Sequence, residues 1–422
     1  MESNSKDYCS AGVIMDKKNM FQVRMYQSWM KLTKLFSFIK EPEKYVGSGT
    51  LKQINHVLLD KKHQIHNVFI VTGPQIYGTN LLAPVFDNLK RNGINYTIYS
   101  GVKTNPIEEQ IETGVVQYKE KRCEAIVAIG GGSVIDAAKC IAARIGNPKE
   151  PLKDMIGLMK VKNTLPLLVA VPTTAGSGSE SSCFAVISDK ETNGKQIIMD
   201  PILMPKFIIL DPELTINLSK EQIAISGMNA LSRAVEAYVS KGHTFKSDKY
   251  AIEATKLICD NLELAYSNTE KDKNALKIHE NLLLGAHYAG LASSRANVGF
   301  CDVISNAIRE KYDIPQGTLN ALLLPYVLKA YGEFAIDRLA NLADQIAYRI
   351  SVDSNKKAEW MINRIESLNS YIGIKNNLDK KIHPKDIRRI ATNAFEEATP
   401  TYPAPKMLTV VEIENLLNEA CK

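Results

Sequence analysis

The 422-residue sequence lacks several features that would assign it to a specialised class of protein. Its seven cysteines are scattered and odd in number, and none forms a CxxC pair, so we expect reduced thiols rather than a disulfide framework. The longest apolar run, LPLLVAV, is far too short to span a bilayer. The first residues, MESNSKDYCSAGVIMDKKNM, contain no apolar core of the length that a signal peptide requires. We therefore expect a cytoplasmic protein with no membrane partner.

The sequence also lacks the signs of a nucleic-acid binder. Its net charge of +6 is modest, and lysines alternate with acids in stretches such as KDKNALK, which is typical of a solvated surface. No RNA-binding signature or zinc-finger spacing is present. A hydrophobic content of 45% with 23% charged residues is that of a globular protein, and the length predicts two domains.

Short β-branched runs alternate with helical stretches between residues 50 and 210. The expected strands are NVFIVTG, YTIYSG, EAIVAIGGGS, LPLLVAVPTT and KFIILDPEL. The expected helices between them include LLAPVFDNLKRNG, IEEQIETGVVQYKEK and IDAAKCIAARIG. Strands that alternate with helices of this length predict βαβ units and a parallel sheet.

The pattern changes after LDPEL, and apolar residues then recur three and four apart almost to the C-terminus, as in YAIEATKLICDNLELAY. We therefore predict three segments: an N-terminal extension over 1–40, an α/β domain over 41–214 and an all-α domain over 215–422. The extension carries the stretch MFQVRMYQSWMKLTKLF, which we interpret as a helix that packs on a domain or a partner.

A run of glycines follows one of the expected strands and precedes a helix. Gly130, Gly131 and Gly132 let the backbone turn sharply and bring its N–H groups against an anion, and the helix that starts near Ser133 adds its positive dipole end. A pyrophosphate is the natural ligand. The alternative is a tight strand–helix turn without a ligand.

Two further loops follow expected strands. VPTTAGSGSE supplies the hydroxyls of Thr173, Thr174 and Ser177, and Gly-rich loops at the carboxyl ends of strands converge where open α/β sheets bind ligands. Dinucleotide binding is therefore favoured over purely structural turns. In VTGPQIYG, the position where a carboxylate would bind an adenosine ribose holds Gly73, which permits NADP as well as NAD.

Taken together, several ordered stretches make the sequence resemble the iron-containing (group III) alcohol dehydrogenases. The stretches are TNPIEEQIETG, AIVAIGGGSVIDAAK, VPTTAGSGSE, ILDPELT, GMNALSRAVEAYVS and YDIPQGTLNALLLPYVL. The resemblance covers about nine-tenths of the chain. It implies a dehydroquinate-synthase-like fold, with an α/β nucleotide-binding domain, an all-α domain, and a cleft that holds NAD(P) and usually iron. It also allows homo-oligomers, which are common in the family.

The same resemblance assigns further residues to the cofactor. Gly130 to Ser133 would line the pyrophosphate, and Thr173, Thr174 and Ser177 would contact the cofactor. Asn105 and Asp136 would belong to the same region. Lys195 lies where the family often places a cofactor-side lysine, although it could equally be an ordinary surface lysine.

The metal ligands that the resemblance implies, one Asp and three His, are all replaced. Asn229 stands in place of the Asp, and Arg233, Asp302 and Gln316 stand in place of the histidines. Asn306 replaces a nearby histidine that is not a ligand. Neutral amides are weak ligands, and a guanidinium has no free lone pair, so we expect no catalytic iron.

The charges of the replacing residues suggest what occupies the space that a metal ion would fill. Arg233 and Asp302 would both have touched one ion, so we predict a buried ion pair between them, with Asn229, Asn306 and Gln316 as hydrogen-bond partners. Residues four apart on a helix share a face, which groups Asn229 with Arg233 and Asp302 with Asn306. The alternative is neutral drift, with Arg233 in solvent.

Three functions remain open. The first is a metal-independent NAD(P)-dependent oxidoreductase, in which Arg233, with help from an amide of Asn306 or Gln316, stabilises charge on the oxygen of an aldehyde or alcohol substrate. An unpaired Arg233 would suit an anionic substrate, and a paired one a simple alcohol. The second is a nucleotide-binding pseudoenzyme that regulates or assembles with a partner. The third retains a metal in an unusual geometry, because oxygens of Asn229, Asp302 and Gln316 can coordinate a hard cation weakly.

Overall fold

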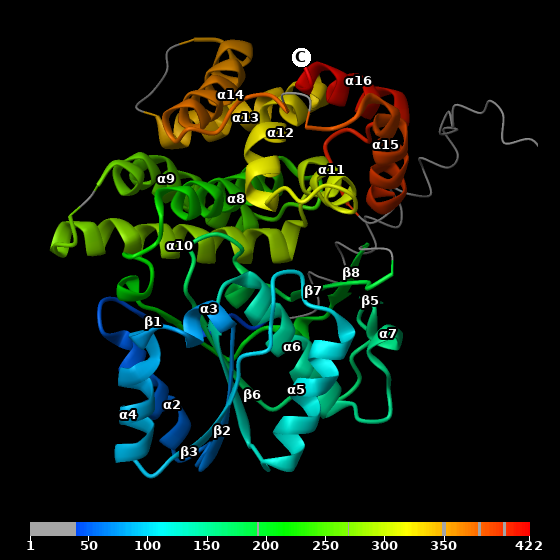
Figure 1. Cartoon of the computed structure of the whole chain (residues 1–422). Helices are drawn as coiled ribbons and strands as arrows, with labels where there is room; N and C mark the ends of the chain where they lie inside the picture. Colours follow the sequence, from blue (N-terminus) through cyan, green and yellow to red (C-terminus); the bar gives the residue numbers. More distant parts are fainter. Residues whose placement is uncertain (1–38, 192–193, 269, 348–351, 379–380, 400–401) are drawn as a thin grey trace, which may run out of the picture.

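The computed structural model describes residues 39–422 apart from 192–193, 269, 348–351, 379–380 and 400–401. An α/β part and a helical part lie one above the other (Figure 1). The predicted extension over 1–40 lies outside the described residues except for its last two. None of the helices in the described ranges is long and apolar enough to cross a bilayer. The six cysteines of this part of the chain are free thiols.

The α/β part is built on a six-stranded sheet in which all neighbouring strands are parallel, in the order β1-β9-β6-β4-β2-β3. Its strands are β1 (Glu43–Val46), β2 (Asn67–Thr72), β3 (Asn95–Tyr99), β4 (Ala125–Gly130), β6 (Leu167–Pro172) and β9 (Phe207–Leu210). The five strands expected from the sequence are confirmed. The edge strand β1 was not expected.

Helices cover both faces of this sheet (Figure 1). α2 (Gln53–Leu59) and α4 (Ala83–Arg91) cover one face, and α5 (Glu108–Glu120) and α6 (Gly132–Gly146) cover the other. Two single-turn helices, α3 (Pro74–Tyr77) at the cleft end and α7 (Leu152–Met155) beside the second sheet, lie in the connections. Alternate residues of β4 face opposite layers: Ile126 and Ala128 pack in the core that includes α5 and α6, and Val127 and Ile129 in the core that includes α2 and α4. Burial on both faces explains why this strand is continuously apolar.

A small second sheet lies beside the first and was not predicted. It contains β5 (Gly157–Leu158), β7 (Phe184–Ser188) and β8 (Lys195–Met199), with β7 and β8 antiparallel. These strands are short and half-buried, so they lack the long apolar run that marks β4.

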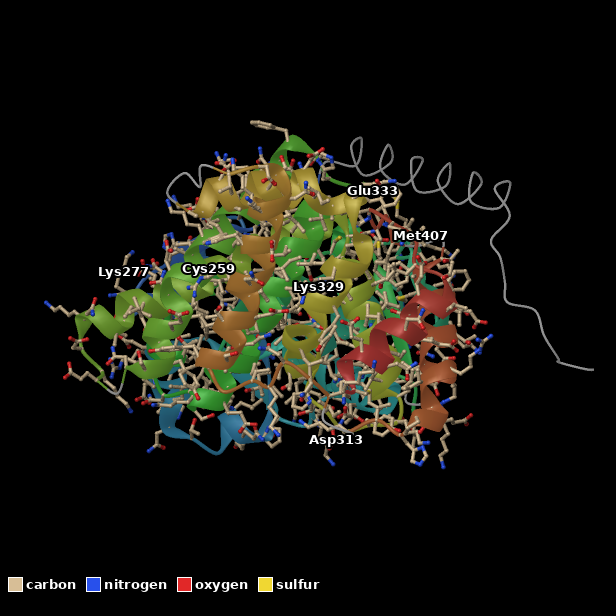
Figure 2. The ribbon with its side chains drawn as sticks, turned by 90° about the horizontal axis from the view of Figure 1, so that it is seen from above. Cys259, Lys277, Asp313, Lys329, Glu333 and Met407 are labelled. Atoms are coloured by element: carbon tan, nitrogen blue, oxygen red, sulfur yellow. The ribbon has the colours of Figure 1, made fainter. Side chains whose placement is uncertain are left out.

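After β9, the described residues form only helices and connections, as expected from the sequence. The helices are α8 (Lys220–Val239), α9 (Phe245–Ser267), α10 (Lys273–Ala296), α11 (Phe300–Arg309), α12 (Gln316–Tyr331), α13 (Glu333–Ile346), α14 (Ser354–Tyr371), α15 (Pro384–Ala398) and α16 (Val410–Ala420). Seen from above, Cys259 of α9 and Lys277 of α10 lie at one side of this part and Met407, before α16, at the other (Figure 2).

The two parts meet closely where the loop after β6 runs under α10. A Cβ atom added to Gly290 of α10 would lie 2.4 Å from the carbonyl oxygen of Gly178, and Gly178 itself has a left-handed φ of 63°. Two glycines therefore allow backbone-to-backbone contact at this point. The contact holds the loop after β6 against α10, and the same loop forms one wall of the cleft between the two parts.

Candidate functional site

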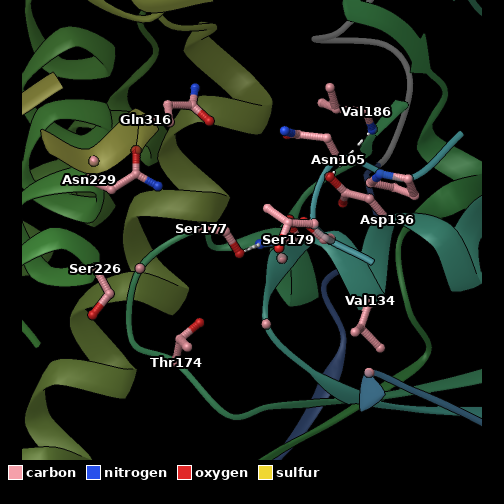
Figure 3. A pocket seen from close by; sticks show the side chains of 18 of the residues that line it. Asn105, Val134, Asp136, Thr174, Ser177, Ser179, Val186, Ser226, Asn229 and Gln316 are labelled. Carbon is pink, nitrogen blue, oxygen red and sulfur yellow. Dashed lines mark hydrogen bonds between the residues drawn. The ribbon is translucent and has the colours of Figure 1, made fainter. Parts of the chain in front are cut away.

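A cleft with a volume of about 720 Å³ lies between the α/β part and the helical part (Figure 3). It brings together nearly all of the residues that the sequence nominated. From the α/β part these are Gly73, Asn105, Gly131, Gly132, Ser133, Asp136, Thr173, Thr174, Ser177 and Lys195. From the helical part they are Asn229, Arg233, Asp302, Asn306 and Gln316.

Gly130 is the exception, because it does not line the cleft. It ends β4, and a Cβ atom there would lie 2.6 Å from Cβ of Val134, so this glycine lets α6 pack closely on the strand. Gly132 is also needed for packing, since its Cβ would lie 2.6 Å from Cβ of Ser177. Gly131 is different: the nearest atom to its Cβ would be Oγ1 of Thr174, at 3.4 Å. The open surface of the turn is therefore at Gly131.

The two glycine-containing loops are joined through the backbone. The N–H of Thr173 donates to the carbonyl of Gly130 at 3.0 Å, which holds the loop after β6 against the turn after β4. Within the second loop, the N–H of Ser179 donates to Oγ of Ser177 at 3.2 Å (Figure 3). Both loops lie at the carboxyl ends of adjacent parallel strands and meet at the N-terminus of α6, as the sequence predicts for an anion site.

Asp136 lies one turn into α6 and faces both the cleft and the second sheet. Its Oδ2 accepts the N–H of Val186 at 3.3 Å, and burial raises the pKa of its carboxyl group. Lys139, three residues on, is fully buried and donates to the carbonyls of Ser182 and Phe184 at 2.7 and 2.8 Å. Burial lowers the pKa of Lys139. These two charged side chains fix α6 to the strand β7 that flanks the cleft.

The ion pair expected at the replaced metal positions is present. Nη2 of Arg233 lies 3.6 Å from Oδ2 of Asp302, and the two side chains are 15% and 11% exposed. A second guanidinium nitrogen, Nη1, donates to the carbonyl of Ser177 in the loop after β6. Arg233 therefore does not extend into solvent, and it joins the helical part to the loop after β6.

Amides complete the surroundings of Asp302. Nε2 of Gln316 donates to its Oδ1 at 3.1 Å, which confirms one of the predicted partners. Nδ2 of Asn320 donates to the same oxygen at 2.8 Å and to Oδ1 of Asn229 at 2.9 Å. Among the described residues, Asn229 is therefore linked to the pair through Asn320 and is not the direct partner that was predicted. The prediction for Asn306 is wrong, because its Nδ2 donates instead to Glu397, at 3.2 Å.

This donor set does not fit a divalent cation. It offers one carboxylate, from Asp302, and that carboxylate is already paired with a guanidinium and two amide N–H groups. Among the described residues, no group of three or more His, Cys, Asp or Glu side chains is arranged to hold a metal ion. A fixed positive charge beside the only anionic ligand opposes a second cation.

A second polar cluster lies at the edge of the cleft around Asn105, which has a left-handed φ of 56°. Its Oδ1 accepts from Nζ of Lys195 at 2.9 Å and from Nη2 of Arg309 at 2.7 Å. Lys195 also donates to Oγ of Ser188 at 2.7 Å. Burial, together with the charge of Arg309, lowers the pKa of Lys195 to about 8. Lys195 is thus a half-buried cleft residue and not an ordinary surface lysine.

Three residues of this site were missed from the sequence: Arg309, Asn320 and Glu397. Arg309 had a usable signal, because it stands seven residues after Asp302 and so falls on the helix face that carries Asp302 and Asn306. Asn320 likewise stands four residues after Gln316. Glu397 comes from the distant helix α15, and no local spacing links it to the cleft.

Comparisons with known proteins agree with this architecture. The model of the iron-containing alcohol dehydrogenase family matches residues 42–212, and that of its C-terminal domain matches 223–421. The NAD-dependent methanol dehydrogenase of Bacillus methanolicus is 31% identical over 91% of this chain and 99% of its own length. The NADPH-dependent butanol dehydrogenase of Clostridium saccharobutylicum is 30% identical over 82% of this chain and 86% of its own.

Solved structures show the same fold. A 1,3-propanediol oxidoreductase superposes with a TM-score of 0.84 and 28% identity, and covers 90% of this chain and 98% of its own. An alcohol dehydrogenase from Oenococcus oeni gives 0.85 and 29%, with the same coverage. The dehydroquinate-synthase-like fold expected from the sequence is thereby confirmed. With family matches over both of its parts, the chain belongs to the iron-containing alcohol dehydrogenase family.

Proposed function

We propose that the chain is an NAD(P)-dependent oxidoreductase that interconverts small aldehydes or ketones and alcohols by hydride transfer without a catalytic metal. The observation that carries this proposal is the cleft itself, in which the glycine and hydroxyl loops face a fixed guanidinium where the family holds its metal. The family supports the hydride-transfer chemistry, and the donor set at the replaced positions supports its independence of iron.

The cofactor loops supply recognition. Gly131 leaves space for an anion at the N-terminus of α6, Ser133 and Thr174 border that space, and Gly73 offers no carboxylate to repel a 2′-phosphate. When bound, the nicotinamide supplies the hydride that reduces a carbonyl carbon. NAD and NADP both suit these loops, and the named relatives include users of each.

Arg233 supplies the electrostatic part of the chemistry. Reduction of a carbonyl builds negative charge on its oxygen, and a guanidinium N–H donates to that oxygen without losing its own charge. Asp302 and the carbonyl of Ser177 hold the guanidinium in place before substrate binds. Because Arg233 is paired, it suits a neutral carbonyl group at this position.

A specific observation favours a second candidate, a nucleotide-binding pseudoenzyme. Both residues nominated for chemistry have protein partners: Arg233 is held by Asp302 and Ser177, and Asn306 by Glu397. A guanidinium fixed in this way could serve only to join the two parts of the chain. In that case the loops would bind NAD(P)H, and no carbonyl compound would oxidise it.

Two measurements on purified protein separate the candidates. Quenching of intrinsic fluorescence by NADPH and by NADH tests the cofactor loops. Aldehyde-dependent NAD(P)H oxidation, measured with EDTA and with added Fe²⁺, tests the chemistry. We expect turnover that is unchanged by either addition, and an Arg233→Gln variant that binds NADPH but turns over at least about 100-fold more slowly.

Lys103→Gln is the matched control, because Lys103 is an exposed lysine that lines the same cleft. It removes one positive charge and should retain turnover. Binding without turnover in the wild-type protein would support the pseudoenzyme. Turnover that requires Fe²⁺ would overturn the metal-independent proposal.

A further inference from the structure

Arg309 is a cation of the cleft for which the proposed function has no role. It ends α11, and its guanidinium reaches across the cleft edge to Oδ1 of Asn105 at 2.7 Å. Its other terminal nitrogen, Nη1, lies 3.5 Å from Oε1 of Gln316. Arg309 therefore connects the α/β part with the amides around Asp302, at the end of the cleft where the carbonyl group would be held.

The positive charge of Arg309 and Lys195 is only partly balanced by nearby carboxylates. In the described part of the chain, neither Arg309 nor Lys195 forms an ion pair with a carboxylate, and the two share one neutral amide oxygen, from Asn105. Asp302 and Asp313 are close enough to Arg309 to interact with it electrostatically, but Asp302 is paired with Arg233 and neither carboxylate forms an ion pair with Arg309. Two half-buried cations thus face each other across a single acceptor.

Such an arrangement is costly unless an anion binds to it. Burial lowers the pKa of the Arg309 guanidinium, and burial with the charge of Arg309 lowers that of Lys195. An anion placed between them would remove this repulsion and gain charge-assisted hydrogen bonds, which are about twice as strong as neutral ones. The guanidinium also matches the two oxygens of a carboxylate.

We propose that Arg309 and Lys195 form a subsite for an anionic group on the substrate, which makes the preferred substrate a short aldehyde that carries a carboxylate. This inference rests on the proposed function, since it concerns the substrate of the same cleft. Gln316 joins Arg309 to the Arg233–Asp302 pair, so the subsite adjoins the carbonyl position. The open turn at Gly131 provides a separate place for the cofactor's phosphates.

The reaction balances with the proposed cofactor. The aldehyde carbon gains a hydride from NAD(P)H, its oxygen gains a proton from solvent, and the products are a hydroxy acid and NAD(P)⁺. The carboxylate is unchanged and serves only for recognition. A hydroxy acid is oxidised by the reverse steps.

The test compares succinic semialdehyde with pentanal, a neutral aldehyde of similar length. We expect the wild-type protein to prefer succinic semialdehyde in kcat/KM, and Arg309→Gln to reduce that preference about 10- to 100-fold, as the loss of a charged hydrogen bond implies. Arg309→Lys should restore part of the preference. Lys103→Gln, which removes an exposed charge from the same cleft, should leave it nearly unchanged.

A binding measurement keeps this inference separate from the proposed function. Titration calorimetry with succinate, on the protein saturated with NADPH, requires no turnover. Succinate binding that Arg309→Gln weakens at least tenfold supports the subsite even if no aldehyde is reduced. Equal succinate affinity in the wild-type and Arg309→Gln proteins, or equal weakening by Lys103→Gln, would overturn it. Weaker NADPH binding by Arg309→Gln, with succinate binding unaffected, would instead assign the cluster to a cofactor phosphate.

Discussion

The pair formed by Arg233 and Asp302 leads to the most specific prediction. Two unit charges 3.6 Å apart attract by about 5 kcal/mol at an effective dielectric constant of about 20. Asp302→Asn removes this attraction and turns an amide N–H₂ toward the guanidinium, while its carbonyl oxygen can still accept from Gln316 and Asn320. Because the side chains are 15% and 11% exposed, we expect a net loss of about 2–4 kcal/mol in the free energy of unfolding.

A double-mutant cycle isolates the pair from its surroundings. Arg233→Met alone leaves Asp302 without its cation, and the double variant leaves no charge, so the double variant should be more stable than the sum of the single losses predicts by about 2 kcal/mol. Urea unfolding followed by tryptophan fluorescence is suitable, because Trp360 lies on α14 of the helical part. A Trp29→Phe background makes it the sole reporter. Additive single losses would refute the pairing argument.

Two further predictions concern the glycine turn after β4 and a buried acid. Gly131→Ala should leave stability nearly unchanged but weaken NADPH binding at least tenfold. Gly132→Ala should itself destabilise the protein by about 1–3 kcal/mol, because its Cβ would clash with Ser177. Thermal melts and NADPH titrations distinguish the two variants. Burial raises the pKa of Glu236 from 4.5 to about 7. Between these values the folded state retains a proton that the unfolded state releases, so stability falls as pH rises, by up to about 3 kcal/mol. Glu236→Gln should make that slope shallower by the share of one group, because burial also raises the pKa of Glu180 and of Glu397 to about 7. An unchanged slope in unfolding free energies between pH 4.5 and 7 would contradict the assignment.

Much of the α/β part could be predicted because its strands carry strong local signals. β2, β4 and β6 are buried on both faces and therefore read as apolar runs that end in glycine or hydroxyl residues. The strands β1, β7 and β8 were not predicted because they are short and half-buried, and their pairing depends on partners distant in sequence. Gly130 was misassigned because sequence alone cannot tell a glycine that packs from one that faces a ligand.

The site was predictable where charge had to be balanced. Arg233 and Asp302 both stand at replaced ligand positions, so their pairing followed from electrostatics. The hydrogen bond between Asn306 and Glu397 depends on how α15 packs on α11, and an amide has too many potential partners for its choice to be inferred from sequence. Arg309 lies on the same face of α11 as Asp302, and attention to helix spacing beyond one turn would have found it.

The most direct test of the central claim is metal analysis of the protein purified without oxygen and then equilibrated with Fe²⁺, combined with NADPH titration of the same sample. We predict that the protein binds NADPH and retains no iron after gel filtration, because Arg233 supplies the positive charge beside Asp302. Stoichiometric iron that Asp302→Asn removes would show that a cation occupies this position and would contradict the account.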